Sequence, residues 1–417
     1  MIHSPQNGLS KDEFSIQLNS LYVCPILTQV CFIIKITSEK QEGKRMKLLH
    51  VGDLHIGKKI KGFSLADDIQ NILNRILQTA KDRNVDGILI AGDIYDSTNP
   101  SSEALSCFDD FISKLHDIKV SCFAVSGNHD NIYRVSFGSQ IMSRENIYFA
   151  KKYSGTLEPI EVSQDVNIWL LPFIRPIDVR TFYPDFANGS YEEMMKTVLK
   201  NISIDKKKTN ILVAHQFVTC NGKAPEKSDS ESVSLGTLDN IDVSNFEDFD
   251  YVALGHIHKP QAMGRQTVRY SGSPLKYSFS EQNDKKSMVL LDIKGKQVDI
   301  EFIDFCPLRD MREVVGYYDD LKKYAPTDDY VKIILKDENF IIDIKHKLES
   351  NFSRIMEIVY DNTYTRENRF TEKAKAVESQ SPLELFKDFY ELQNNQEMTE
   401  KQLKKVEEIF ASMGEKE

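Results

Sequence analysis

The stretch Gly52-Asp53-Leu54-His55 decides how the rest of this sequence is interpreted. It directly follows Lys47-Leu48-Leu49-His50-Val51, a largely apolar run that predicts a buried strand beginning near Met46. Residues two apart on an extended segment point the same way, so Asp53 and His55 can face one bound group. The glycine before them lets the backbone turn sharply. The first strand is therefore expected to end in a polar, ligand-binding corner.

The same arrangement, an apolar run that ends in Asp, Asn or His, occurs four more times. The later clusters are Gly92-Asp93-Ile94-Tyr95-Asp96, Gly127-Asn128-His129-Asp130, Ala214-His215 and Gly255-His256-Ile257-His258. Ligands of open α/β sheets gather outside the carboxyl ends of the strands, so all five clusters are expected to converge. Asp, His and Asn side chains hold divalent transition metals. About eight donors are too many for one ion but suit two ions about 3.5 to 4 Å apart that share a carboxylate.

Each cluster alone has a simpler explanation. A lone D-x-H motif or strand-end histidine is more often structural, and G-D after a strand is often only a turn. The five clusters together, each after an apolar run, favour the metal centre. Asp96 and Asp130 either orient a neighbouring group or are surface turn carboxylates, and neither is assigned as a metal ligand.

The spacing of the apolar runs predicts an α/β layered domain. Further strands are expected at 87–91, 120–126, 168–172, 210–214 and 251–254, with helices at 67–83 and 102–115. We expect a main domain at 46–304, a small α+β unit at 305–364, a linker at 365–380 and a helix pair at 381–413. The two helices begin at the capping boxes Ser381-Pro382-Leu383-Glu384 and Thr399-Glu400-Lys401-Gln402. Residues 1–45 show no clear periodicity and are expected to be a disordered or non-native extension.

Composition narrows the class of protein. The 417 residues carry a formal net charge of −10, which argues against a general nucleic-acid coat protein but does not exclude a nuclease. The six cysteines are scattered without a C-x-x-C pair, which indicates a reducing, cytoplasmic compartment. The apolar stretch at 22–36 is too short to span a membrane.

Taken together, D-x-H, G-D-x-x-D, G-N-H-D, a strand-end His and G-H-x-H resemble the signature of the calcineurin-like metallophosphoesterases. Within that superfamily the chain resembles the SbcD family, the bacterial relatives of the nuclease subunit in double-strand-break repair complexes. Tyr270-Ser271-Gly272-Ser273-Pro274 and the C-terminal layout also fit this resemblance, which covers about residues 46–413. It implies a layered β-sandwich flanked by helices, a small α+β capping domain and a C-terminal helix pair that binds an ATPase partner.

The resemblance also implies roles for individual residues. The first metal would be bound by Asp53, His55, Asp93 and His258, and the second by Asp93, Asn128, His215 and His256. Asp93 would bridge the two ions, which the family implies to be manganese. The catalytic histidine would be His129, which would donate a proton or stabilise charge on the phosphate.

The implied activity is a DNA nuclease of recombination, repair and replication. It would act as an exonuclease on double strands and an endonuclease on single strands and hairpins, together with an SbcC-type ATPase. A homodimer within a heterotetramer, without a membrane, is expected. A small-molecule phosphatase or phosphodiesterase of the same fold is the alternative, because metal motifs do not report the leaving group. A non-catalytic scaffold ranks last because every expected ligand is present. The lysines Lys58, Lys59 and Lys61 either form a solvated face, the more common role of a short lysine run, or contact DNA phosphates.

Overall fold

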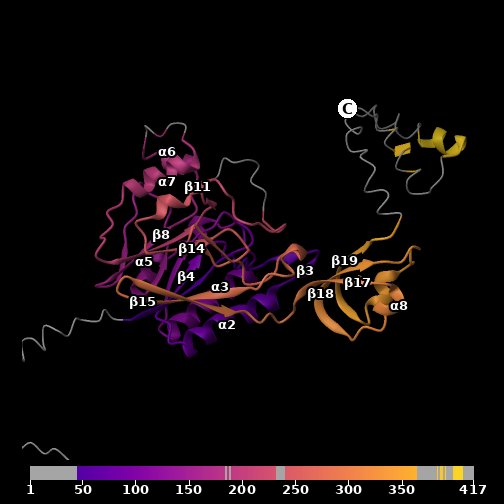
Figure 1. Ribbon diagram of the computed structural model, residues 1–417, viewed down its shortest axis with the longest axis horizontal. Coiled ribbons are helices and arrows are strands. Elements are labelled where there is room, and N and C mark those ends of the chain that lie inside the picture. Colours follow the sequence, from indigo (N-terminus) through magenta and orange to yellow (C-terminus); the bar gives the residue numbers. More distant parts are fainter. Residues whose placement is uncertain are drawn as a thin grey trace, which may run out of the picture.

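The computed structural model describes residues 45–183, 186, 189–231, 240–363 and 398–406, with the separate positions 383, 386, 387 and 390. Expectations for residues 1–44, for the linker and for most of the helix pair lie outside the described residues. Figure 1 shows a large body built from two sheets and a smaller unit beside it that contains β17, β18 and β19.

The first large sheet has the strand order β16-β15-β1-β4-β5-β6. Its strands are β1 (Met46–Val51), β4 (Gly87–Ala91), β5 (Ser121–Val125), β6 (Ile147–Phe149), β15 (Ser287–Lys294) and β16 (Gln297–Asp304). β1, β4, β5 and β6 run parallel, whereas β15 and β16 form an antiparallel hairpin beside β1. Three strands that precede predicted metal motifs therefore end at the same edge.

The second large sheet has the order β13-β14-β12-β9-β8-β7. Its strands are β7 (Ile160–Ser163), β8 (Val166–Leu171), β9 (Thr209–His215), β12 (Tyr251–Gly255), β13 (Gln261–Met263) and β14 (Arg265–Tyr270). β8, β9, β12 and β14 are parallel, so His215 and Gly255 lie at equivalent ends and are paired in register.

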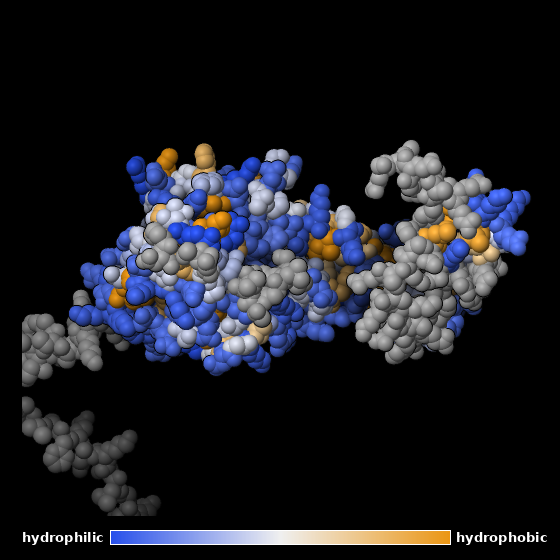
Figure 2. Space-filling view, turned by 90° about the horizontal axis from the view of Figure 1, so that it is seen from above, coloured by the Kyte–Doolittle hydropathy of each residue, from blue (hydrophilic) through white to orange (hydrophobic). Residues whose placement is uncertain are grey.

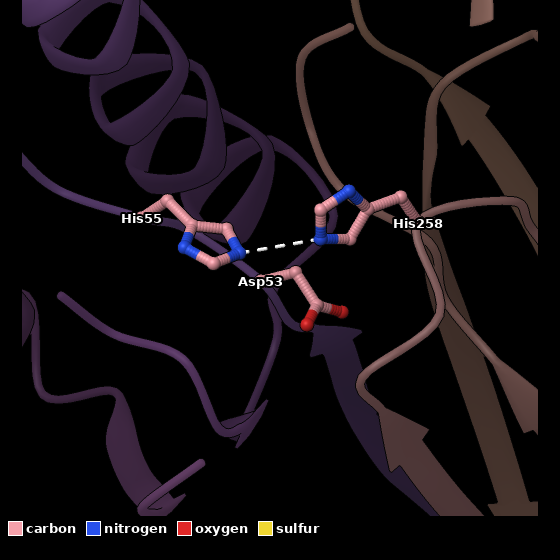
Figure 3. Close-up of side chains that lie close together, drawn as sticks. All are labelled: Asp53, His55 and His258. Carbon is pink, nitrogen blue, oxygen red and sulfur yellow. Dashed lines mark hydrogen bonds between the residues drawn. The ribbon is translucent and has the colours of Figure 1, made fainter. Parts of the chain in front are cut away.

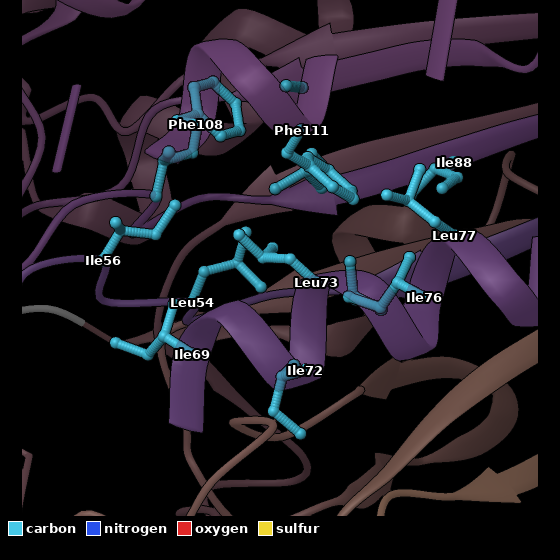
Figure 4. Close-up of a cluster of buried hydrophobic side chains, with 14 of the residues drawn as sticks. Leu54, Ile56, Ile69, Ile72, Leu73, Ile76, Leu77, Ile88, Phe108 and Phe111 are labelled. Carbon is cyan, nitrogen blue, oxygen red and sulfur yellow. The ribbon is translucent and has the colours of Figure 1, made fainter. Parts of the chain in front are cut away.

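Apolar side chains join the layers. Leu89 and Val125 of the first sheet share a core with Val213 and Ala253 of the second. The helices α2 (Ala66–Asp82) and α3 (Ser102–Asp117) cover the outer face of the first sheet, as Figure 4 shows. The buried positions of α2 recur at helical spacing, namely Ile69, Ile72, Leu73, Ile76, Leu77 and Ala80. Ser101 caps α3 by accepting a hydrogen bond from the backbone of Ala104.

The second sheet is covered by α6 (Pro176–Arg180), α7 (Tyr191–Lys200) and η3 (Val243–Phe246). Short elements complete the body: β2 (Lys59–Ile60), β3 (Phe63–Ser64), α4 (Ile132–Val135), α5 (Ser139–Met142), η1 (Ser143–Glu145), β10 (Val218–Thr219), β11 (Ile241–Asp242) and η4 (Phe279–Glu281). The predicted α/β layered architecture is confirmed.

A third, parallel sheet has the order β17-β18-β19 and its own core. Its elements are β17 (Met311–Gly316), α8 (Tyr318–Leu321), β18 (Thr327–Leu335), α9 (Ile344–Leu348) and β19 (Phe352–Tyr360). It contacts α2 through Asp68, which accepts hydrogen bonds from Arg309 and Tyr330, each 2.8 Å long. The exact domain boundaries stay a prediction.

Part of the second C-terminal helix is described. Residues 400–406 are helical, and the backbone of Gln402 donates to the Thr399 hydroxyl while the Gln402 side chain accepts from the Thr399 backbone. This is the predicted second capping box. In the described parts of the chain, no helix is long and apolar enough to cross a membrane.

Candidate metal centre

The loops after β1, β4, β5, β9 and β12 meet where the carboxyl ends of the two sheets adjoin. Four residues in these loops have left-handed backbones although none is glycine: Asp53 (φ 53°), His55 (φ 44°), Asp93 (φ 47°) and His256 (φ 101°). Such conformations are disfavoured and persist where the surrounding structure holds them in place, commonly at functional sites. All four are predicted metal ligands.

Two glycines let these loops approach each other. A Cβ atom on Gly127 would overlap the carboxylate of Asp93, and one on Gly255 would overlap the backbone carbonyl of Ala91. No larger residue fits at either position without movement of the backbone. The glycine at each of these two positions therefore permits a close approach between neighbouring strand ends.

Asp93 lies at the middle of the centre. Its Oδ1 accepts a 2.9 Å hydrogen bond from the backbone of His129. Its Oδ2 lies 3.6 Å from His55 Nε2 and 3.5 Å from His215 Nε2. One oxygen is thus fixed by the protein, and the other faces histidines from two different loops.

On one side of Asp93, the ligand atoms of Asp53, His55 and His258 lie within 4.8 Å of one another. Figure 3 shows the two imidazole rings facing each other with Asp53 beside them. Their Nε2 atoms are 3.2 Å apart. All three side chains are buried.

On the other side, Asn128 lies between two histidines. Its Oδ1 is 2.9 Å from His215 Nε2 and 2.9 Å from His256 Nδ1. His215 Nδ1 is 2.8 Å from the carbonyl oxygen of Ala91, which only accepts, so this nitrogen carries the proton. The Nε2 lone pair of neutral His215 is therefore directed at the centre. The structure thus brings all seven predicted ligands together.

The electrostatics of the cluster fit divalent cations. Burial, reinforced by the charge of Asp93, raises the pKa of Asp53 well above its ordinary value. Burial lowers the pKa of His55, His215 and His258, and lowers that of His256 to about 3. Neutral imidazoles with free lone pairs beside two crowded carboxylates form a donor set that cations stabilise.

The remaining residues of the G-N-H-D motif have separate places. His129 Nδ1 donates to the carbonyl oxygen of Asp96 over 3.0 Å, and its ring lies edge-on to that of His55. The Asp130 carboxylate accepts from the backbones of Gly127, Ile94 and Tyr95 at 2.8 to 3.0 Å. Asp130 is thus not a surface carboxylate: it ties the loop after β4 to the loop after β5.

Three further residues extend the centre. Asp96 Oδ1 lies 3.3 Å from His55 Nδ1 and accepts a 2.7 Å hydrogen bond from Lys58. The expectation of a solvated lysine face is wrong for Lys58, whose side chain is 14% exposed and lies over the Tyr277 ring. The Tyr277 hydroxyl donates to the carbonyl oxygens of Asp53 and Leu54. The sequence pattern does not predict Tyr277, because its contact depends on a loop distant in the sequence.

Comparison with known proteins gives the family. The profile of the calcineurin-like phosphoesterases matches residues 46–260, and that of the type 5 capsule protein repressor C-terminal domain matches residues 307–394. The SbcD component of the nuclease SbcCD from Staphylococcus epidermidis is 32% identical over 384 residues, covering 89% of this chain and 100% of that protein. The chain belongs to the SbcD family of calcineurin-like phosphoesterases. As an SbcD-family member it is a metal-dependent phosphoesterase, and its buried Asp and His side chains form groups that could hold divalent metal ions.

Two solved structures show a low similarity to this chain. A dimetal phosphatase from Danio rerio is 10% identical with a TM-score of 0.35, covering 63% of this chain and 99% of that one. GAP50, the anchor in the inner membrane complex of Plasmodium, is 13% identical with a TM-score of 0.34, covering 62% and 84%. The family assignment therefore rests on the family profiles and on the SbcD match.

Proposed function

We propose that this protein is a two-manganese DNA nuclease that acts with an SbcC-type ATPase in DNA recombination and repair. The proposed activities are exonuclease cleavage of double strands and endonuclease cleavage of single strands and hairpins, in the cytoplasm. The match to an SbcCD nuclease component over its full length supports this proposal over a small-molecule phosphatase. The organisation proposed with it is a nuclease domain at 46–304, a capping domain at 305–364 and an ATPase-binding helix pair at 381–413.

The position of Asp93 carries the two-metal assignment. Because Oδ2 faces His55 on one side and His215 on the other, one carboxylate can serve both groups of ligands. Asp53, His55 and His258 would complete the first site, and Asn128, His215 and His256 the second. The ions would supply the Lewis acidity that activates an attacking water and neutralises charge on the phosphate.

A hydrogen bond within the protein orients the His129 ring for proton transfer. Since His129 Nδ1 donates to a backbone carbonyl, any second proton on the ring is carried by Nε2. That atom is then available to protonate the leaving oxygen or to stabilise charge on the phosphate. Asp130 holds the backbone of this loop against the loop that carries Asp93.

A direct assay separates the nuclease from the phosphatase alternative. The purified chain is incubated with manganese and end-labelled linear duplex DNA, and in parallel with a generic phosphatase substrate. Manganese-dependent cleavage of the duplex supports the proposal. Hydrolysis of the small substrate without any cleavage of duplex, single-stranded or hairpin DNA would contradict it.

Exposed apolar side chains around α3, α4 and α5 support the proposed homodimer. The visible face in Figure 2 is mostly hydrophilic with small hydrophobic patches. Leu105 of α3 and Phe137, which lies between α4 and α5, line one pocket, and Tyr133 of α4 and Ile141 of α5 are exposed apolar side chains close to Phe137 in the sequence. We call these four residues the α3–α5 patch. Phe137 is 83% exposed and Ile141 is 71% exposed. Exposed apolar clusters commonly mark protein contacts, and a two-fold dimer would cover the same patch on both copies.

The dimer is tested by charge introduction. Phe137→Glu should convert the dimer to a monomer in light scattering, because a buried unpaired carboxylate is costly. Phe340→Glu is the matched control, since Phe340 is 78% exposed but lies in the third-sheet unit. A monomeric wild type, or a Phe137→Glu protein that stays dimeric, contradicts the assignment.

A further inference from the structure

A hydroxyl group lies against the outer side of His258. Ser230 Oγ is 2.7 Å from His258 Nδ1, the nitrogen that faces away from His55. The same hydroxyl donates to Glu281 Oε1 over 2.6 Å. The adjacent residue Glu231 accepts a 2.8 Å hydrogen bond from the backbone of His258. The loop at 228–231 therefore holds both the ring and the backbone of this histidine.

The available protons determine which way each bond runs. A serine hydroxyl has one proton, and the Glu281 carboxylate can only accept, so the proton of Ser230 is directed to Glu281. Ser230 Oγ is then an acceptor toward the ring, which requires a proton on His258 Nδ1. In the neutral ring the lone pair is consequently on Nε2, the atom that faces His55.

Glu281 is itself held in place. It is fully buried, and its Oε2 accepts a 2.7 Å hydrogen bond from the buried ammonium of Lys286. Lys286 also donates to the carbonyl oxygen of His258 over 2.8 Å and to the Ser273 hydroxyl over 3.1 Å. A buried ion pair with several further hydrogen bonds fixes the carboxylate, so Glu281 does not turn away from Ser230.

We propose that Ser230 and Glu281 are positioning residues that hold neutral His258 with its proton on Nδ1 and its Nε2 lone pair toward the first metal. The inference rests on the proposed assignment of His258 as a ligand. His215 on the second side has a backbone carbonyl in the equivalent role. The first side instead depends on a side-chain hydroxyl and a buried carboxylate, so a point substitution can remove its support without removing a ligand.

The test compares Ser230→Ala, Ser230→Thr and His258→Ala in the full chain. Calorimetric titration of each metal-free protein with manganese alone measures the affinity of the two sites separately. Loss of a partner that orients a metal-bound histidine typically weakens metal binding by about 10- to 100-fold. We expect Ser230→Ala to weaken one site by that factor and to leave the other unchanged. Ser143→Ala is the control, because its exposed hydroxyl bonds only the Gln140 carbonyl among the described contacts.

A second measurement reads the tautomer itself. Nitrogen-15 chemical shifts of His258 in the metal-free wild type should show the proton on Nδ1, and those of Ser230→Ala should show a shift toward the Nε2 form. Ser230→Thr keeps the hydroxyl and should retain wild-type affinity and the wild-type tautomer. Equal losses in the Thr and Ala variants would mean that the hydroxyl is not responsible.

The positioning role of Ser230 and the ligand role of His258 can be overturned separately. If His258→Ala loses one ion but Ser230→Ala binds both with wild-type affinity, the positioning role is overturned and the metal centre stands. If His258→Ala still binds two ions normally, the ligand assignment is wrong and the inference falls with it.

Discussion

The backbone N–H of His129 donates a 2.9 Å hydrogen bond to Oδ1 of Asp93. This contact links the proposed catalytic residue to the proposed bridging ligand through the backbone, independently of the His129 side chain. It leaves Asp93 Oδ2 free to face His55 and His215. Substitutions at the two positions should therefore have separable effects on metal binding and on catalysis.

Asp93→Asn should abolish metal-dependent cleavage, because one neutral side chain replaces the charge that both sites share. Loss of a residue that orients a metal ligand typically weakens metal binding by roughly 10- to 100-fold. Manganese affinity should fall by more than this in Asp93→Asn, because the substitution changes a ligand itself. Because weaker manganese binding stabilises the folded protein less, manganese should also raise the melting temperature of the variant by less than that of the wild type. Metal content and melting temperature measure both effects.

Asp109→Asn provides the control for this variant, because Asp109 is exposed on α3. It should keep wild-type metal content and activity. Near wild-type cleavage by Asp93→Asn at saturating manganese would show that Asp93 does not bridge two ions.

His129→Ala should keep its metals and lose activity. The substitution removes the imidazole but preserves the backbone N–H that fixes Asp93. Loss of a general acid or base typically costs about 10² to 10⁴ in rate. Mass spectrometry of the native protein should find unchanged manganese. Loss of bound manganese would instead identify His129 as a ligand.

Stabilisation by metal should increase with pH. Burial and the charge of Asp93 raise the pKa of Asp130 to about 7, compared with about 4 in an unfolded chain. The folded metal-free protein keeps this proton longer than the unfolded chain, so the contribution of Asp130 to stability falls as pH rises from about 4 to about 7. Divalent cations beside Asp93 offset the negative charge that causes this loss.

The measurement is the melting temperature with and without manganese between pH 5 and pH 8. The gap between the two curves should widen as pH rises, because the ligands also bind metal in their deprotonated forms. A gap that is constant or narrows over this range would argue against buried carboxylates as the metal-binding groups.

The sequence predicts the parts of the site that depend on local pattern. Asp53 and His55 follow a buried strand, and the parallel register that pairs Gly255 with His215 brings two distant motifs together as expected. Parallel strands end at the same edge of a sheet. The local pattern alone therefore predicts that the residues at their ends lie close together. Trp169, within the strand expected at 168–172, is also buried.

Long-range contacts explain what the sequence does not predict. Left-handed backbones at Asp53 and Asp93 contradict local preference and are held by the surrounding loops. β15, which forms a hairpin with β16, does not alternate between apolar and polar residues, because both faces of the strand are largely buried. Ser230 and Tyr277 reach the site from loops whose positions depend on the complete fold.

Residues 1–45 should be dispensable. β1 begins at Met46, and the described contact before it is an exposed ion pair between Arg45 and Asp292. Exposed pairs of this kind contribute little to stability. A protein that begins at Met46 should keep the melting temperature, manganese content and cleavage rate of the full chain. A truncated protein that fails to fold, or folds without activity, would place the extension in the core.

The C-terminal helix pair is proposed to bind the ATPase. The sequence places apolar residues at helical spacing, namely Leu383, Phe386, Phe389 and Leu392 of the first predicted helix and Leu403, Val406, Ile409 and Phe410 of the second. Two short helices cannot bury both stripes fully against each other, and each buried side chain contributes about 1.5 to 3 kcal/mol. One contact between the described parts of the two segments is polar, from the Gln402 amide to the Tyr390 hydroxyl. We therefore propose that the stripes bind in a groove of the ATPase partner.

Removing residues 381–417 should therefore abolish co-purification with an SbcC-type ATPase. Manganese binding and the melting temperature of the remaining protein should stay nearly unchanged, because the ligands and the two large sheets lie before residue 305. A double charge substitution, Val406→Glu with Leu403→Glu, tests the stripe without shortening the chain. Full-affinity binding of the ATPase by the truncated protein would refute the partner assignment. A large drop in melting temperature would instead show that the helices fold back on the nuclease domain, since only packing against that domain makes its stability depend on them.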